Sequence, residues 1–236
     1  MTREEELAHN LRAVHARIAS ACESAGRHPD DVTLIVVTKT YPASDIEILS
    51  KLGVRDIGEN KHPEAGRKKD EITAGDALTW HFIGGLQSNK AAAVASYAAV
   101  VHSVDRLKLV PQLAKGAERS GRTVSCLVQV SLEPPGGGGG PGRAGVDPAG
   151  VLELAAAIEA DPRLALRGVM GVAPLDGDPV AAFGVLAETA RRVRHNHPPA
   201  DVLSAGMSDD LEQAITAGAT HVRVGRSVLG ERPRLG

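Results

Sequence analysis

The sequence predicts an α/β protein that folds as a single (β/α)₈ TIM barrel across residues 1–236. Short apolar runs alternate with amphipathic segments, and eight such runs are present, which is the number that closes a parallel barrel. Hydrophobic residues make up 42% of the chain but aromatic residues only 2%. The core must therefore consist of Val, Leu, Ile and Ala, like the layered interior of such a barrel.

A doubly wound open sheet is the alternative fold. It usually carries fewer strands and a glycine-rich first turn, and no GxGxxG motif follows the first apolar run here. The barrel is therefore favoured.

The strands are predicted where β-branched and apolar residues cluster between glycine, proline and polar residues. The first run ends at Lys39, and Pro42 prevents its continuation. The eight predicted strands cover residues 33–39, 54–58, 79–84, 98–103, 124–131, 166–170, 201–204 and 221–225.

The helices are predicted from apolar residues spaced three or four apart and from capping residues at their ends. Ser88, Asp105 and either Ser208 or Asp209 are the predicted N-caps of three of them. The predicted helices cover residues 7–22, 43–51, 64–71, 88–97, 105–119, 147–160, 179–194 and 208–217. Because only eleven residues follow Gly225, we expect the N-terminal helix to cover the barrel wall beside the last strand.

Composition excludes several classes of protein. The formal net charge is −2, so no overall field favours nucleic acid or membranes. Cys22 and Cys126 lie far apart without a CxxC motif, which argues against a disulfide framework or a zinc site. The N-terminus lacks an apolar signal region, so we expect a cytoplasmic protein. The run Gly136 to Gly140 indicates a mobile surface loop within one domain.

A lysine at the end of the first strand is the first candidate for chemistry. An ammonium group at the mouth of an apolar barrel is partly desolvated, which lowers its pKa towards the free amine that Schiff-base chemistry requires. The alternative is that Lys39 is simply the first solvated residue after a strand.

The loops after strands seven and eight suggest a phosphate site. The segment from Ser204 to Asp210 combines a hydroxyl, a glycine and a helix start, and Gly225 to Ser227 provides a second set of backbone N–H groups. Ordinary helix capping is the alternative for either loop alone, but barrel phosphate sites frequently lie here. An amine and a phosphate cradle, with Arg223 between them, suggest pyridoxal 5′-phosphate (PLP). A permanently charged arginine at the pyridine nitrogen would weaken carbanion chemistry.

Several motifs then resemble a known family, the pyridoxal phosphate homeostasis proteins, also called YggS or PROSC. The segments that carry the resemblance are VVTKT at 36–40, GEN at 58–60, WHFIGGLQSNK at 80–90, LSAGMSDD at 203–210 and VRVG at 222–225. The resemblance implies a PLP-binding barrel of fold type III, without the C-terminal β domain of alanine racemase. It also implies a role in holding, buffering or delivering PLP, with no established enzymatic activity.

The resemblance also implies roles for individual residues. Lys39 would bind PLP as an internal aldimine, and Arg223 would approach the pyridine nitrogen. The further cofactor-binding residues would be Asn60, His81, Ser204, Gly206, Met207, Gly225, Arg226 and Ser227. Asn60 and His81 would line the pocket, although His81 could equally be a satisfied histidine packed beside Trp80. No metal site is expected.

The chain departs from the family pattern at two positions. The family often has an aromatic residue where this chain has Lys61, and a threonine where it has Arg226. The missing threonine hydroxyl removes one phosphate contact that Ser227 could replace.

Two enzymatic alternatives compete with the carrier function. A PLP-dependent amino-acid racemase needs acid and base groups on both faces of its substrate, and this chain offers only Tyr41 and Tyr97 as tyrosines. A cofactor-free Schiff-base aldolase would leave the phosphate cradle without a purpose. The expected partners are PLP and apo forms of PLP-dependent enzymes, and a monomer is expected, with a dimer as the alternative.

Overall fold

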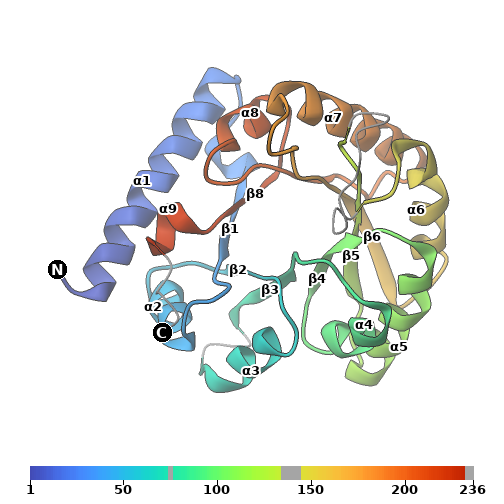
Figure 1. The fold of residues 1–236 in the computed structure, drawn as a ribbon, viewed down its shortest axis with the longest axis horizontal. Coiled ribbons are helices and arrows are strands. Elements are labelled where there is room, and N and C mark those ends of the chain that lie inside the picture. Colours follow the sequence, from blue (N-terminus) through green and yellow to red (C-terminus); the bar gives the residue numbers. More distant parts are fainter. Residues whose placement is uncertain (74–76, 134–144, 232–236) are drawn as a thin grey trace.

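The structure is a computed structural model that describes residues 1–73, 77–133 and 145–231, and its strands form a closed parallel barrel inside a ring of helices (Figure 1). Each strand pairs with the next, and β8 pairs with β1. The strands are β1 Thr33–Val37, β2 Asp56–Glu59, β3 Thr79–Phe82, β4 Val100–Val104, β5 Val124–Gln129, β6 Leu164–Met170, β7 Val202–Ser204 and β8 His221–Val224. The predicted (β/α)₈ fold is confirmed.

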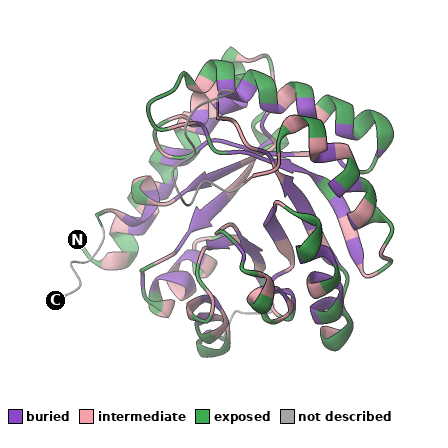
Figure 2. Ribbon diagram, turned by 45° about the vertical axis from the view of Figure 1, so that its right-hand side comes forward, coloured by how far each residue is buried: buried purple, intermediate pink, exposed green. Residues whose placement is uncertain are grey.

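The helices lie outside the barrel and present their exposed faces to solvent (Figure 2). They are α1 Arg3–Ser24, α2 Ala43–Lys51, α3 Glu64–Glu71, α4 Ser88–Ala95, α5 Val110–Ser120, α6 Val151–Glu159, α7 Pro179–Asn196, α8 Leu211–Thr216 and α9 Arg226–Leu229. Short 3₁₀ turns cover Pro29–Asp31, Leu107–Leu109 and Pro148–Gly150.

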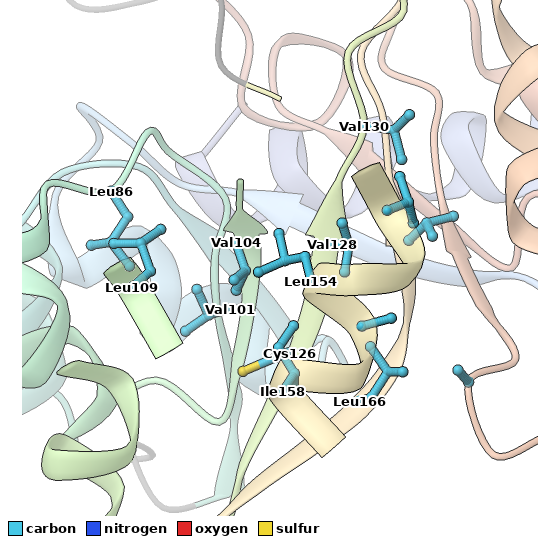
Figure 3. Packing of buried hydrophobic residues seen from close by; sticks show 14 of the residues in the cluster. Leu86, Val101, Val104, Leu109, Cys126, Val128, Val130, Leu154, Ile158 and Leu166 are labelled. Carbon is cyan, nitrogen blue, oxygen red and sulfur yellow. The ribbon is translucent and has the colours of Figure 1, made fainter. Parts of the chain in front are cut away.

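The core between helices and strands is aliphatic, as the composition predicts. Leu154 and Ile158 lie on the inner face of α6, in the same buried cluster as Cys126 and Val128 of β5 (Figure 3). A second cluster joins α1 and α2 to β1, β2 and β8. Packing on both sides explains why the strands read as continuous apolar runs.

The N-terminal helix covers the wall beside β8, as the sequence predicts. α1 packs against α8 and α9, and the two short helices share its apolar cluster. Asn10 donates its side-chain N–H to the Val228 carbonyl at 3.0 Å. Arg17 forms a 2.8 Å ion pair with Glu212 of α8. α1 therefore supports the segments that follow the last two strands.

Three predicted N-caps are wrong. α4 has Gln87 as its N-cap rather than Ser88. A 3₁₀ turn precedes α5, and Asp105 instead pairs with the neighbouring Arg106 side chain. α8 begins at Leu211, because the residues assigned to its first turn form a loop. Asp105 and Asp209 each pair with an arginine side chain instead of capping a helix.

Some expectations concern features outside the strand–helix pattern. Cys22 and Cys126 are both free and buried. Among the described residues, no helix is long and apolar enough to cross a membrane. The run Gly136 to Gly140 lies outside the described residues.

Candidate functional site

A cavity of about 200 Å³ lies at the carboxyl ends of the strands, where barrel enzymes place their active sites. Its walls are formed by Val37, Lys39, Tyr41, Ile83, Met207, Ser208, Asp209, Arg223, Gly225 and Arg226. The residues predicted from the sequence that meet in these walls are Lys39, Met207, Arg223, Gly225 and Arg226. The predicted residues that do not line it are Asn60, His81, Ser204, Gly206 and Ser227.

Lys39 lies in a tight turn that follows β1. The strand ends at Val37, two residues before the predicted end. The Tyr41 N–H donates to the Thr38 carbonyl at 3.1 Å and closes the turn. Thr40 has a φ of 70°, a left-handed conformation that costs on the order of 1–3 kcal/mol for a residue other than glycine. The surrounding structure must therefore hold this turn in place.

A buried cluster of charges beneath the turn provides that support. Lys68 Nζ lies 2.8 Å from the carboxylates of both Glu59 and Glu64. It also donates to the Thr38 carbonyl at 2.9 Å. Glu59 Oε1 accepts the Thr38 hydroxyl at 2.7 Å, and Glu64 Oε1 accepts the Thr40 N–H at 3.0 Å. The cluster thus bonds both residues that flank Lys39.

The two carboxylates of this cluster have opposite pKa shifts. Burial raises the pKa of Glu59, although the charge of Lys68 opposes the change. Burial also acts to raise the pKa of Glu64, but hydrogen bonds from Lys68 and from the Thr40 N–H outweigh it, and the pKa falls. Lys68 is therefore the cation that both carboxylates share, the buried one of Glu59 and the half-buried one of Glu64.

Arg223 projects from β8 and is only 4% exposed. Its Nη1 donates to Ser204 Oγ at 2.7 Å, and its Nη2 donates to the Gly171 carbonyl at 2.9 Å. Burial lowers the pKa of Arg223 to about 10, with Asp210 opposing the change. No described carboxylate is within ion-pair distance of it. A buried cation at the cavity wall favours a ligand that brings an acceptor or a negative charge.

The loop between β7 and α8 runs from beneath the cavity to its wall. Ser204 is fully buried, and its hydroxyl also lies 3.0 Å from His102 Nδ1. Gly206 has a φ of 88°, and a Cβ there would lie 2.7 Å from Ala214 Cβ. Both facts require glycine at this position. Met207 follows in the cavity wall and is 37% exposed.

The segment after β8 forms the adjoining part of the wall. Gly225 packs closely on β1, because a Cβ there would lie 3.2 Å from the Val37 carbonyl. Arg226 begins α9 and forms a 2.7 Å ion pair with Asp209 across the rim. Ser227 is the second residue of α9. The first N–H groups of a helix have no acceptor within it, so they are available to a ligand.

Asn60 lies directly after β2, beside the cavity rather than in its wall. Its Oδ1 is buried and has no hydrogen-bond partner. A Cβ at Gly84 would lie 2.1 Å from the Asn60 carbonyl oxygen. The glycine therefore allows the two segments to approach each other.

Gly84→Ala is expected to destabilise the protein by about 1–3 kcal/mol, because the new methyl group meets backbone that must move. Gly85→Ala is the matched control, since a Cβ at Gly85 meets nothing within 4 Å. Urea unfolding of the two variants measures the difference. Equal stability would show that Asn60 and its strand can move without cost.

His81 lies inside the barrel, away from the cavity that holds Lys39. It is 3% exposed, with Nε2 2.9 Å from Asp56 Oδ1 and Nδ1 2.9 Å from His102 Nε2. It lines a second cavity of about 220 Å³, formed by residues near the amino-terminal ends of the strands. Trp80, its neighbour in sequence, belongs to the apolar cluster around α1.

Sequence reasoning missed five residues of the cavity wall, and the first of them is Val37 at the end of β1. Ser208 follows Met207 and was interpreted only as a helix cap. Tyr41 lies two residues after Lys39, and its hydroxyl donates to the Gly230 carbonyl at 2.7 Å. Asp209 and Ile83 complete this set. Of these residues, Ser208 is the one that the sequence could have indicated as a ligand-binding residue, because its hydroxyl lies next to a glycine turn.

Among the described residues, no group of three or more histidine, cysteine, aspartate and glutamate side chains is arranged to hold a metal ion.

Comparison with known proteins identifies the family of this chain. The alanine racemase N-terminal domain family matches residues 5–233. A protein of Mycobacterium tuberculosis, named pyridoxal phosphate homeostasis protein, is 40% identical over 248 aligned residues, which cover 98% of this chain and 94% of that protein.

Solved structures give the same fold. PipY of Synechococcus elongatus with PLP bound aligns with a TM-score of 0.80 and 32% identity, covering 95% of this chain and all of PipY. Alanine racemase of Corynebacterium glutamicum aligns with a TM-score of 0.66 and 16% identity, which shows the fold alone, and the match covers 99% of this chain but 62% of the racemase. The chain belongs to the alanine racemase N-terminal domain family, and within it to the pyridoxal phosphate homeostasis proteins.

Proposed function

We propose that this protein binds PLP at Lys39 and serves as a carrier that holds the cofactor and hands it to other proteins. The observation that carries the proposal is that one cavity brings together an amine and a buried guanidinium that has no carboxylate partner among the described residues. The relative PipY, at 32% identity, has been solved with PLP bound. The names of the related homeostasis proteins support the same ligand.

The groups around the cavity fit the chemistry of PLP, which offers an aldehyde, a pyridine nitrogen and a phosphate. The Lys39 amine would condense with the aldehyde and release water, forming a Schiff base. The guanidinium of Arg223 would face the ring nitrogen. The buried Oδ1 of Asn60 lacks a partner, as expected beside a site where a ligand or a water completes the bonding.

The phosphate would be held by the two loops. Ser208 and Arg226 line the cavity from the loops after β7 and β8, and the first N–H groups of α9 would face the same region. Arg226 stands where the family often has threonine, and it brings a cation in place of a hydroxyl. Asp209 forms an ion pair with Arg226 and so compensates part of the charge of that arginine.

The same residues argue for carriage rather than catalysis. Bound PLP supplies an electron sink that is strongest when its ring nitrogen is protonated. Arg223, as a cation in a buried site, would keep that nitrogen unprotonated. The Tyr41 hydroxyl, one candidate acid or base near Lys39, donates to a backbone carbonyl. We therefore propose that the protein has no enzymatic turnover of its own and acts in the cytoplasm on apo forms of PLP-dependent enzymes.

Direct transfer is the decisive experiment. The protein is loaded with PLP, freed of excess cofactor and mixed with an apo-aminotransferase, and the recovery of aminotransferase activity is followed. We expect recovery that is faster than with protein whose cofactor has been fixed by borohydride, which is the matched control. A colourless protein that gains no mass with PLP would overturn the binding proposal.

An amino-acid racemase is the second candidate, because the fold is shared with alanine racemase. Incubation of the PLP-loaded protein with L-amino acids, followed by chiral chromatography, separates the two functions. Multiple turnovers to D-amino acid would contradict the carrier proposal.

A further inference from the structure

A continuous chain of hydrogen bonds runs through the inside of the barrel, starting from Arg223. Arg223 Nη1 donates to Ser204 Oγ at 2.7 Å, and Ser204 Oγ lies 3.0 Å from His102 Nδ1. His102 Nε2 lies 2.9 Å from His81 Nδ1. His81 Nε2 lies 2.9 Å from Asp56 Oδ1. Four contacts thus join the guanidinium at the PLP cavity to a carboxylate on β2.

This chain of hydrogen bonds crosses the barrel from one end to the other. Asp56 is the first residue of β2, whereas Ser204 is the last residue of β7. Ser204 and His102 are fully buried and His81 is 3% exposed, while the Asp56 side chain is 25% exposed. The carboxylate is therefore the member of the chain that reaches solvent, at the second cavity.

The donors and acceptors of the chain are consistent with a single direction. Burial lowers the pKa of His102 well below its usual value, so this ring carries one hydrogen. The carboxylate of Asp56 requires a hydrogen on His81 Nε2. If Ser204 donates to His102 Nδ1, then His102 Nε2–H donates to His81 Nδ1. Every ring nitrogen then has a partner, and each bond polarises the next.

This direction connects a cation to an anion. Arg223 is buried without a described carboxylate in contact, and its uncharged partners, the Ser204 hydroxyl and the Gly171 carbonyl, compensate its charge poorly. Through Ser204 and two histidines, the chain ends on the carboxylate of Asp56. A guanidinium fixed in this way presents its remaining N–H groups in one orientation.

We infer that His102, with His81 and Asp56, positions the Arg223 guanidinium through Ser204 and thereby sets its orientation toward the cavity. These residues touch neither the cavity nor any ligand in it, so they are positioning residues. The identity of that ligand as PLP rests on the proposed function. The orientation of Arg223 in the protein without PLP can be measured independently of that proposed function.

The test replaces the central residue of the chain. His102→Leu removes both of its hydrogen bonds while keeping an apolar side chain of similar size. Ser204→Ala breaks the chain next to Arg223 with a smaller change, and serves if His102→Leu does not fold. His221→Leu is the matched control, because His221 lines the same second cavity but its side-chain hydrogen bond is to Thr220, which is not a member of this hydrogen-bond chain.

The first measurement uses the protein without PLP. Nitrogen-15 NMR of the Arg223 side chain should show separate, slowly rotating Nη groups in the unchanged protein and in His221→Leu. In His102→Leu and Ser204→Ala the signals should average as rotation becomes fast. Slow rotation of the Arg223 Nη groups in both His102→Leu and Ser204→Ala would overturn the inference, whether or not the protein binds PLP.

The second measurement adds PLP. We expect His102→Leu to bind it about tenfold more weakly, the loss that a hydrogen bond to a charged group represents. His102→Asn, whose amide can still reach Ser204, should recover part of the affinity, and His221→Leu should match the unchanged protein. Unchanged PLP affinity and absorption spectrum in His102→Leu would contradict a positioning role. Failure of every variant and of the unchanged protein to bind PLP would instead overturn the proposed function.

Discussion

Lys39→Ala is expected to abolish covalent PLP binding entirely and to leave the fold intact. Lys39 lies in a turn at the barrel mouth, outside the apolar clusters, so its side chain contributes little to packing. The unchanged protein should be yellow with PLP, and borohydride should fix the cofactor on this residue. Absorption spectra and the mass of the borohydride-treated protein measure the loss.

Lys61→Ala is the matched control for that experiment. Lys61 is an exposed lysine from the neighbouring segment after β2, and its replacement should keep both colour and added mass. Covalent PLP on the Lys39→Ala protein would assign the chemistry to another lysine. A loss of helical circular dichroism in Lys39→Ala would show that the residue is structural.

Lys68→Met is expected to cost about 3–5 kcal/mol of unfolding free energy, because it leaves a buried carboxylate without its cation. The Glu59 side chain is 1% exposed, and that of Lys68 is 8% exposed. Chemical denaturation measures the loss. The double variant Lys68→Met with Glu59→Gln removes both charges and should recover most of the stability.

The loss of unfolding free energy in Lys68→Met should become larger as the pH rises. The pKa of Glu59 is raised in the folded protein by burial, even with Lys68 present. For a raised pKa, the stabilising contribution is complete below the unfolded-state pKa and is lost as the pH rises through the folded-state value. Removing Lys68 raises the folded-state pKa further, so the loss becomes larger toward neutral pH. A deficit that is independent of pH, or no recovery in the double variant, would contradict this account.

The fold could be predicted because its determinants are local. Eight apolar runs and their spacing were sufficient, since strands covered on both faces leave continuous apolar segments such as Val36 to Val37. Helix starts were less certain, because Asp105 and Ser88 can bond to several neighbours and only the folded chain decides among them.

Part of the site could also be predicted, for a related reason. Lys39 follows β1 and Arg223 lies near the carboxyl end of β8, and a closed barrel brings these two positions to one cavity. Their charges make both residues easy to single out in the sequence. Lys68 was not predicted, because a helix rich in charges reads as a solvated surface. His102 and Asp56 were not predicted either, since nothing in the sequence indicates that polar residues on separate strands point to a common interior.

Closure of the barrel also has a consequence for the order of folding. β1 pairs with β8, and the Arg3 guanidinium donates to the Leu229 carbonyl across 226 positions of sequence. Pairings between segments so distant along a chain form late and slowly. During synthesis on the ribosome, β1 and the buried face of α1 therefore await their partners until nearly the whole chain has emerged.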